Sequence, residues 1–144
     1  MEKPINSLSM LRQALKTKIY NERKVFGHPC CPICQEPFIM QDPSMHEVFV
    51  PRSVVRGCSE EVQNAIFSPQ NVVLVHEGKC HLYAQHYFDG KVACAMQILQ
   101  YEGEDSILEW MDDIDSMMRT LDNQKRIILQ EAIARNGETN GSII

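Results

Sequence analysis

The chain carries two close pairs of sulfur and imidazole side chains, Cys31-Pro-Ile-Cys34 and, well downstream, His76-x3-Cys80. Structural zinc takes four such ligands in a tetrahedron, and proteins usually supply them as two close pairs. A gap of two residues lets both sulfurs of one turn reach the same ion. The sequence therefore predicts one structural Zn²⁺ bound by both pairs, with the segment between them closed into a loop.

Other assignments of these side chains stay open. A Cys-x2-Cys pair can also be two buried or redox-active thiols, and His76 could be an ordinary core histidine. Cys30 could replace Cys31, although the spacing Cys30-x3-Cys34 is less usual for a ligand pair. The spacing of the pairs favours metal over disulfides in a reducing compartment. The two remaining thiols, Cys58 and Cys94, are expected to have no ligand role.

The composition is that of one domain without a membrane segment. Hydrophobic residues make up 44% of the 144 positions, and no apolar run approaches the roughly 18 residues that a membrane span needs. The N-terminus shows no charged segment followed by an apolar one, so no signal peptide is visible. We therefore expect a cytoplasmic protein with no membrane partner.

The net charge of −5 is spread unevenly along the chain. Residues 1–30 hold six Lys/Arg against two Glu, a local +4, whereas residues 91–144 hold five against ten, a local −5. A nucleic acid would meet the basic N-terminal segment first. The overall balance argues against tight, non-specific DNA binding, and the acidic C-terminal helices could face a basic protein partner.

Hydrophobic periodicity predicts four long helices and two short strands. A helical spacing of three to four positions between apolar residues occurs in residues 8–23, 91–101, 105–121 and 123–135. β-Branched and aromatic residues mark strand candidates at 46–54 and 71–76, and shorter helix candidates are 59–67 and 79–88. We expect Pro51 to end or kink the first strand, and we expect helix N-caps at Ser59, Asp105 and Asp122.

These elements divide an α+β chain into four parts. The parts are an N-terminal helix in residues 1–29, a zinc-stabilised core in 30–90, C-terminal helices packed on the core in 91–135, and a flexible tail in 136–144.

The ordered motifs CPIC, HEVFVPRS and NVVLVHEGKCH resemble the HNH endonucleases, also called ββα-metal or His-Me finger nucleases. The likeness covers residues 31–86, and with the later helices the chain also resembles small HNH proteins encoded by bacteriophages. It implies a small zinc-bound, treble-clef-like ββα-metal core with an N-terminal helix and a C-terminal helical extension. It further implies a metal-dependent endonuclease acting on DNA, in the host cytoplasm for a phage-encoded protein.

The resemblance also implies roles for individual residues. Asn71 would brace the loop that orients the catalytic histidine, and His81 would bind the catalytic divalent metal. Aligned on the apolar residues that follow, His46 takes the metal position and Glu47 the place of the general base. The alternative register makes His46 the base and leaves Met45, a poor ligand for a hard cation, at the metal position. Because adjacent strand side chains point to opposite faces, one of His46 and Glu47 should point away unless the strand ends there.

Two features depart from the family pattern. The second zinc pair is His-x3-Cys rather than Cys-x2-Cys, which zinc accepts. One helical turn after His81 the family often has another metal-binding histidine, but this chain has Gln85. His86 follows at i+5, rotated about 140° from His81 on a regular helix. The catalytic metal would thus have few protein ligands, with waters or phosphate oxygens filling the rest, as suits Mg²⁺ or Mn²⁺. Arg52 or Arg56 could clamp a phosphate, or be solvated charges.

Three functional classes therefore remain. The first is a metal-dependent HNH endonuclease that hydrolyses DNA phosphodiester bonds, which the resemblance assigns to phage DNA processing. The second is a zinc-stabilised nucleic-acid-binding or adaptor module whose nuclease site has degenerated, which the departures at Glu47 and Gln85 favour. Taken singly, Asn71 could also be an ordinary turn residue and His81 a surface helix histidine. The third is a structural zinc domain for protein interaction.

Overall fold

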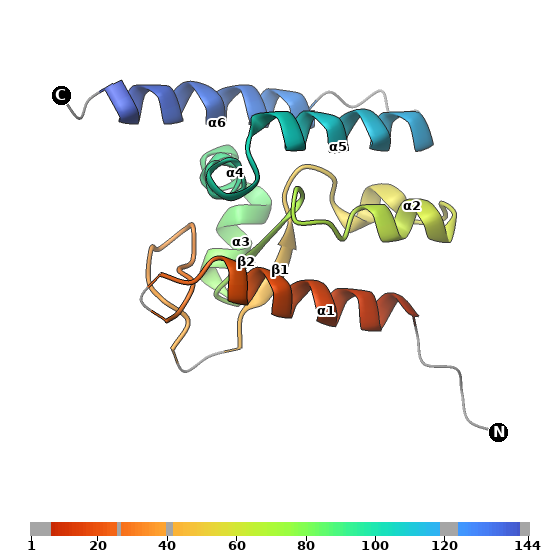
Figure 1. The fold of residues 1–144 in the computed structure, drawn as a ribbon, viewed down its shortest axis with the longest axis horizontal. Coiled ribbons are helices and arrows are strands. Elements are labelled where there is room, and N and C mark those ends of the chain that lie inside the picture. Colours follow the sequence, from red (N-terminus) through yellow and green to blue (C-terminus); the bar gives the residue numbers. More distant parts are fainter. Residues whose placement is uncertain (1–6, 26, 40–41, 119–123, 142–144) are drawn as a thin grey trace.

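The computed structural model describes residues 7–25, 27–39, 42–118 and 124–141. The fold is α+β and mostly helical, as the periodicity predicted, with one two-stranded sheet (Figure 1). The elements in chain order are α1 (Ser7–Glu22), β1 (Ser44–Glu47), the 3₁₀ helix η1 (Arg52–Val55), α2 (Glu60–Ala65), β2 (Val72–Val75), α3 (Lys79–His86), α4 (Phe88–Glu102), α5 (Glu104–Met117) and α6 (Gln124–Gly141).

The small sheet lies between two helical layers. In Figure 1 the sheet and α3 lie in the middle, with α1 on one side of them and α5 and α6 on the opposite side. The strands are antiparallel, with His46 opposite Val73 and Glu47 opposite Val72. All four residues of β2 are buried, because α1 and α4 both pack against this strand. The chain therefore has one hydrophobic core, with β2 at its centre.

The first strand is shorter than the sequence predicted. It was expected to run to Pro51, but β1 ends at Glu47. Beyond it the backbone N–H groups of Phe49 and Val50 donate to the side chain of Asn71, at 2.8 and 3.0 Å, instead of to a neighbouring strand. This side chain takes the place of sheet pairing, and the chain turns away into η1.

Helix α1 is held to the core by a buried arginine. Arg23 donates to the carbonyl oxygens of Val72 and Pro69, at 2.9 and 3.0 Å, and lies 3.9 Å from a carboxylate oxygen of Glu102. Burial lowers the pKa of Arg23, while Glu102 acts in the opposite direction. This burial was not predictable from the sequence pattern, because a cation near the C-terminal end of a helix is usually solvated.

The C-terminal helices pack as a group around α4. Gly90 allows this helix to approach α3 closely, because a Cβ added there would lie 2.3 Å from the carbonyl oxygen of Tyr83. Trp110 of α5 donates its indole N–H to the carbonyl oxygen of Ala65, which ties α5 to α2. The acidic face of α5 is partly neutralised within the chain, since Asp112 and Asp115 form ion pairs with α6 through Lys125 and Arg126.

The helix ends agree with prediction in part. The Ser59 hydroxyl accepts from the backbone N–H of Val62, as a cap should. The predicted cap at Asp105 is wrong: α5 begins at Glu104 with Gly103 as the capping residue, whose φ of +85° favours glycine. Asp122 lies outside the described residues. Helix α6 continues to Gly141, into the range expected to be a flexible tail. Among the described helices, none combines the length and apolar character that crossing a bilayer requires.

Candidate metal centre and adjoining cavities

The two predicted ligand pairs come together in space. One ligand atom from each of four side chains lies within 4.8 Å of the others, a group that can hold a metal ion such as zinc; these residues, here called the zinc cluster, are Cys31, Cys34, His76 and Cys80. The Cys34 sulfur is 3.3 Å from Nδ1 of His76. The cluster contains Cys31 and not Cys30, so the alternative pairing is not the one that the fold assembles.

The first pair sits on a tight turn. The backbone N–H of Gln35 donates to the carbonyl oxygen of Cys31 at 2.8 Å, and the N–H of Cys31 donates to Glu36 at 2.9 Å. Gln35 itself has a positive φ of 65°, a strained conformation for a residue other than glycine. This turn directs the Cys31 and Cys34 sulfurs toward the same point.

The second pair spans the junction between β2 and α3. His76 follows the last residue of β2, and Cys80 lies in the first turn of α3. Gly78 turns the chain between them with a φ of +93°, and the N–H of His81 donates to the carbonyl oxygen of His76 at 3.1 Å. The ring of Phe38 packs against His76 with centroids 4.5 Å apart.

The thiols of the cluster are crowded. Burial raises the pKa of the Cys80 thiol to about 12, and the neighbouring sulfurs of Cys31 and Cys34 act in the same direction. Without a cation the Cys80 thiol therefore favours its neutral form, whereas a bound Zn²⁺ would hold it as the thiolate. Cys94, expected to have no ligand role, is fully buried on α4, and burial raises its pKa as well.

A second pair of imidazoles lies beside the cluster. His46 of β1 and His81 of α3 have ring centroids 5.2 Å apart in an edge-to-face arrangement. The pKa of His46 is lowered to about 4, mainly by burial and also by His81 and Lys91, while a hydrogen bond with the Ala84 backbone acts in the opposite direction. At neutral pH the His46 ring is therefore neutral, the form that ligates a metal. Its buried Nε2 has no hydrogen-bond partner among the described residues, so this nitrogen is available to a ligand.

His46 and Glu47 line the same space. Both border a cavity of about 600 Å³, here called the histidine cavity, which is also lined by Arg52, His81, His86 and Lys91. The strand ends at Glu47, so the alternation that would send one of the two side chains away stops at that point. Two nitrogens of Arg52 donate to Oε1 of Glu47, at 3.2 and 3.0 Å. Oε2 accepts none of the hydrogen bonds found among the described residues.

Asn71 braces the segment that follows these two residues. Its side chain is fully buried. Oδ1 accepts from the backbone N–H groups of Phe49 and Val50, while Nδ2 donates to the carbonyl oxygens of Val50 and Ile66, at 3.0 and 2.9 Å. The Asn71 carbonyl oxygen also accepts from Val48 at 2.7 Å. Three of the four side-chain hydrogen bonds hold the chain after β1, and the fourth reaches the end of α2.

Of the remaining predicted residues, some line the histidine cavity and one does not. Gln85, one turn after His81, places Nε2 3.3 Å from Nε2 of that histidine. His86 borders the histidine cavity despite its expected rotation away, because α3 ends there. Arg52 lines the cavity, but Arg56 is exposed and borders neither of the two cavities described here.

One residue near the site, Arg12 of α1, was not predicted from the sequence. It lines a neighbouring cavity of about 500 Å³, here called the arginine cavity, whose walls share Met45, Arg52 and His81 with the histidine cavity. The local excess of positive charge in residues 1–30 was the available signal, but nothing in the spacing of α1 singled out this arginine.

In comparisons with known proteins, no protein-family model, no curated protein and no solved structure matches this chain.

Proposed function

We propose that this chain is a metal-dependent endonuclease that hydrolyses DNA phosphodiester bonds, with β1, β2 and α3 as its ββα-metal core. The observation that carries the proposal is the meeting of His46 and His81, from elements far apart in the sequence, beside the carboxylate of Glu47 in one cavity. A chain that used these histidines only for packing would have no reason to leave a buried imidazole nitrogen without a partner.

His46 and His81 are the residues that would hold a divalent cation such as Mg²⁺ or Mn²⁺. The neutral His46 ring and its unpartnered Nε2 suit this task. A cation bound there would supply positive charge to a phosphate group and to the leaving 3′ oxygen. With only two imidazoles contributed by the chain, most coordination positions stay open to water and substrate oxygens.

Glu47 is the candidate general base. Its carboxylate would take a proton from the attacking water, a task that requires an oxygen facing the cavity. Arg52 fixes the carboxylate through Oε1 and leaves Oε2 to receive the proton. The alternative register, with His46 as the base, remains open. Loss of Glu47 would abolish proton transfer in the first register, and loss of His46 would abolish it in the second.

A plasmid-nicking assay tests the proposal. Zinc-loaded protein is assayed without added divalent metal, with Mg²⁺ and with Mn²⁺, comparing wild type, His46→Ala, His81→Ala and Glu47→Gln. We expect metal-dependent nicking by wild type and a loss of at least about 100-fold in each variant, the range of one general base. Glu61→Gln is the matched control, since Glu61 is an exposed acid of α2 that lines neither cavity.

A second function is favoured by two contacts. Gln85 lies within hydrogen-bond distance of Nε2 of His81, and Arg52 already occupies one oxygen of Glu47. Both contacts would suit a zinc-stabilised nucleic-acid-binding or adaptor module that no longer cuts. Wild-type protein that binds DNA but nicks none of it with either metal would establish this class and refute the nuclease.

A further inference from the structure

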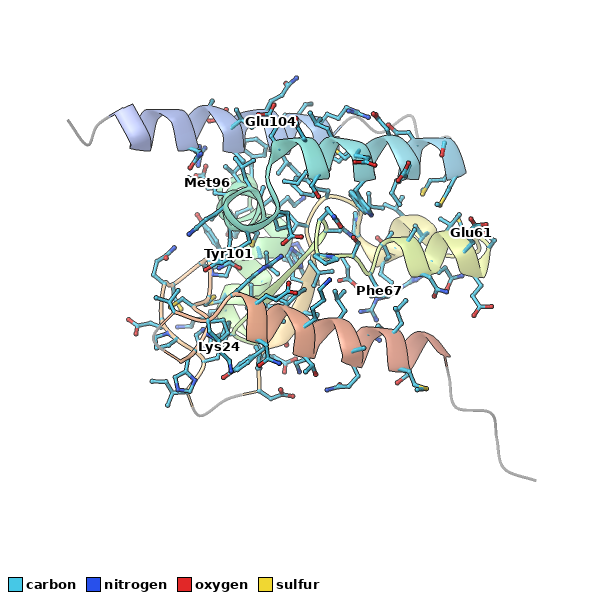
Figure 2. The ribbon with its side chains drawn as sticks, in the orientation of Figure 1. Lys24, Glu61, Phe67, Met96, Tyr101 and Glu104 are labelled. Atoms are coloured by element: carbon cyan, nitrogen blue, oxygen red, sulfur yellow. The ribbon has the colours of Figure 1, made fainter. Side chains whose placement is uncertain are left out.

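Two arginines from distant parts of the chain meet at one aromatic ring. The guanidinium carbon of Arg12 lies 5.4 Å from the centroid of the Phe67 ring, and that of Arg52 lies 5.5 Å from it. Phe67, labelled in Figure 2, lies next to α1 and follows the end of α2. The ring therefore holds two cationic groups near one another, although like charges repel.

The acids nearby offset only one of these two charges. Arg52 is paired with Glu47 at 3.0 Å, whereas no carboxylate lies within ion-pair distance of Arg12 among the described residues. Burial lowers the pKa of Arg12, and Arg52 lowers it further, with Glu47 acting in the opposite direction. The Nε of Arg12 is buried and has no hydrogen-bond partner among the described residues. The pair of arginines thus keeps an uncompensated charge and an unused donor.

The other charges on the walls do not remove this excess. Lys16 and Asp42 also line the arginine cavity, but they pair with each other at 2.8 Å. Glu77 borders the cavity as well, yet it is exposed and forms no ion pair among the described residues. Among the described residues, Glu77 is therefore not paired with Arg12.

The position of the pair suggests what it binds. Arg52 and His81 line both cavities, so an anion held by the arginines would lie beside the proposed reaction centre. Guanidinium groups match phosphate oxygens with paired, charge-assisted hydrogen bonds. A small anion would pair with the uncompensated charge of the Arg12 guanidinium without displacing Glu47 from Arg52.

We propose that Arg12 and Arg52 bind one backbone phosphate of a DNA strand, next to the phosphate that faces His46 and His81. This rests on the proposed function in taking DNA as the ligand. Helix α1 thereby becomes part of the substrate site, and the basic N-terminal segment acquires a specific contact.

The first test is DNA binding by zinc-loaded protein without added divalent metal, so that the DNA stays intact. A fluorescent duplex is titrated with wild type, Arg12→Gln and Lys18→Gln. The last variant also removes one positive charge from α1, at an exposed site that borders neither cavity. We expect Arg12→Gln to bind about tenfold more weakly. Its plot of log affinity against log salt should be shallower by about 0.9, whereas Lys18→Gln should change both far less. A folded Arg12→Gln protein that binds as tightly as Lys18→Gln overturns the proposal.

The second test needs no variant and decides the matter even where Arg12→Gln fails to fold. Inorganic phosphate is titrated into wild-type protein while the arginine Nε–H resonances are followed by NMR. We expect shifts at Arg12 and Arg52 and none at Arg126, which is ion-paired on α6. Unchanged Arg12 and Arg52 signals overturn the proposal. A protein that binds DNA through Arg12 but never cuts it refutes the nuclease alone, while metal-dependent cutting that is indifferent to Arg12 refutes this inference alone.

Discussion

Replacing Asn71 with alanine tests how the chain after β1 is positioned. The side chain is fully buried and makes four hydrogen bonds, all to backbone groups. At about 1 kcal/mol of net stability for each bond, their loss amounts to about 4 kcal/mol. A domain of this size is stable by only about 5–15 kcal/mol. Asn71→Ala should therefore lose a large fraction of the free energy of unfolding.

The assay is guanidinium denaturation of zinc-saturated protein followed by circular dichroism, with free energies from linear extrapolation. The matched control is Asn64→Ala on α2, where Oδ1 is buried without a partner among the described residues. That change removes no such bond and should stay within about 0.5 kcal/mol of wild type. A cost below about 1 kcal/mol for Asn71→Ala would refute the claim that this amide fixes the segment.

A third variant separates the two halves of the amide. Asn71→Asp keeps an oxygen for the N–H groups of Phe49 and Val50, but it faces the carbonyl oxygens of Val50 and Ile66 with a second acceptor. A buried carboxylate so placed has a raised pKa. The stability deficit of this variant should therefore shrink as the pH falls, because the protonated form can donate one bond. A deficit that grows on acidification, relative to wild type, would contradict this account.

Three further changes have expected outcomes. Chelation of the metal from the zinc cluster should lower the denaturation midpoint, and one equivalent of Zn²⁺ should restore it, checked by elemental analysis and circular dichroism; an unchanged midpoint would show that the cluster contributes nothing. Gly90→Ala should lower the free energy of unfolding by about 1–3 kcal/mol, because its Cβ would meet the carbonyl oxygen of Tyr83. Its control is Gly137→Ala on α6, which has open space around it and should raise that free energy by up to about 1 kcal/mol in the same denaturation series. Arg23→Met should cost about 2–4 kcal/mol, since two buried carbonyl oxygens lose their donors; a neutral result in thermal denaturation would mean that water replaces the guanidinium.

The zinc cluster and the fold class were readable from the sequence because they depend on local rules. Two close ligand pairs fix which side chains must converge, and the cluster of the structure contains the residues so predicted. The helices follow the apolar periodicity, with ends that move by a few residues. These features need no knowledge of how distant parts of the chain pack.

Features that depend on tertiary contacts could not be predicted from the sequence. The end of β1 at Glu47 depends on Asn71, which captures the backbone groups that would have extended the strand. The placement of Arg12 depends on Phe67, whose ring it reaches across the gap between α1 and α2. The role of Arg23 depends on β2 lying under its helix. In each case the local sequence is compatible with either a solvated or a buried side chain.

One peptide bond separates Cys80, a member of the zinc cluster, from His81, whose ring faces His46. Neighbouring residues on one helix cannot be displaced independently, so whatever disturbs the first reaches the second. Loss of zinc would therefore inactivate the proposed nuclease even where magnesium is abundant.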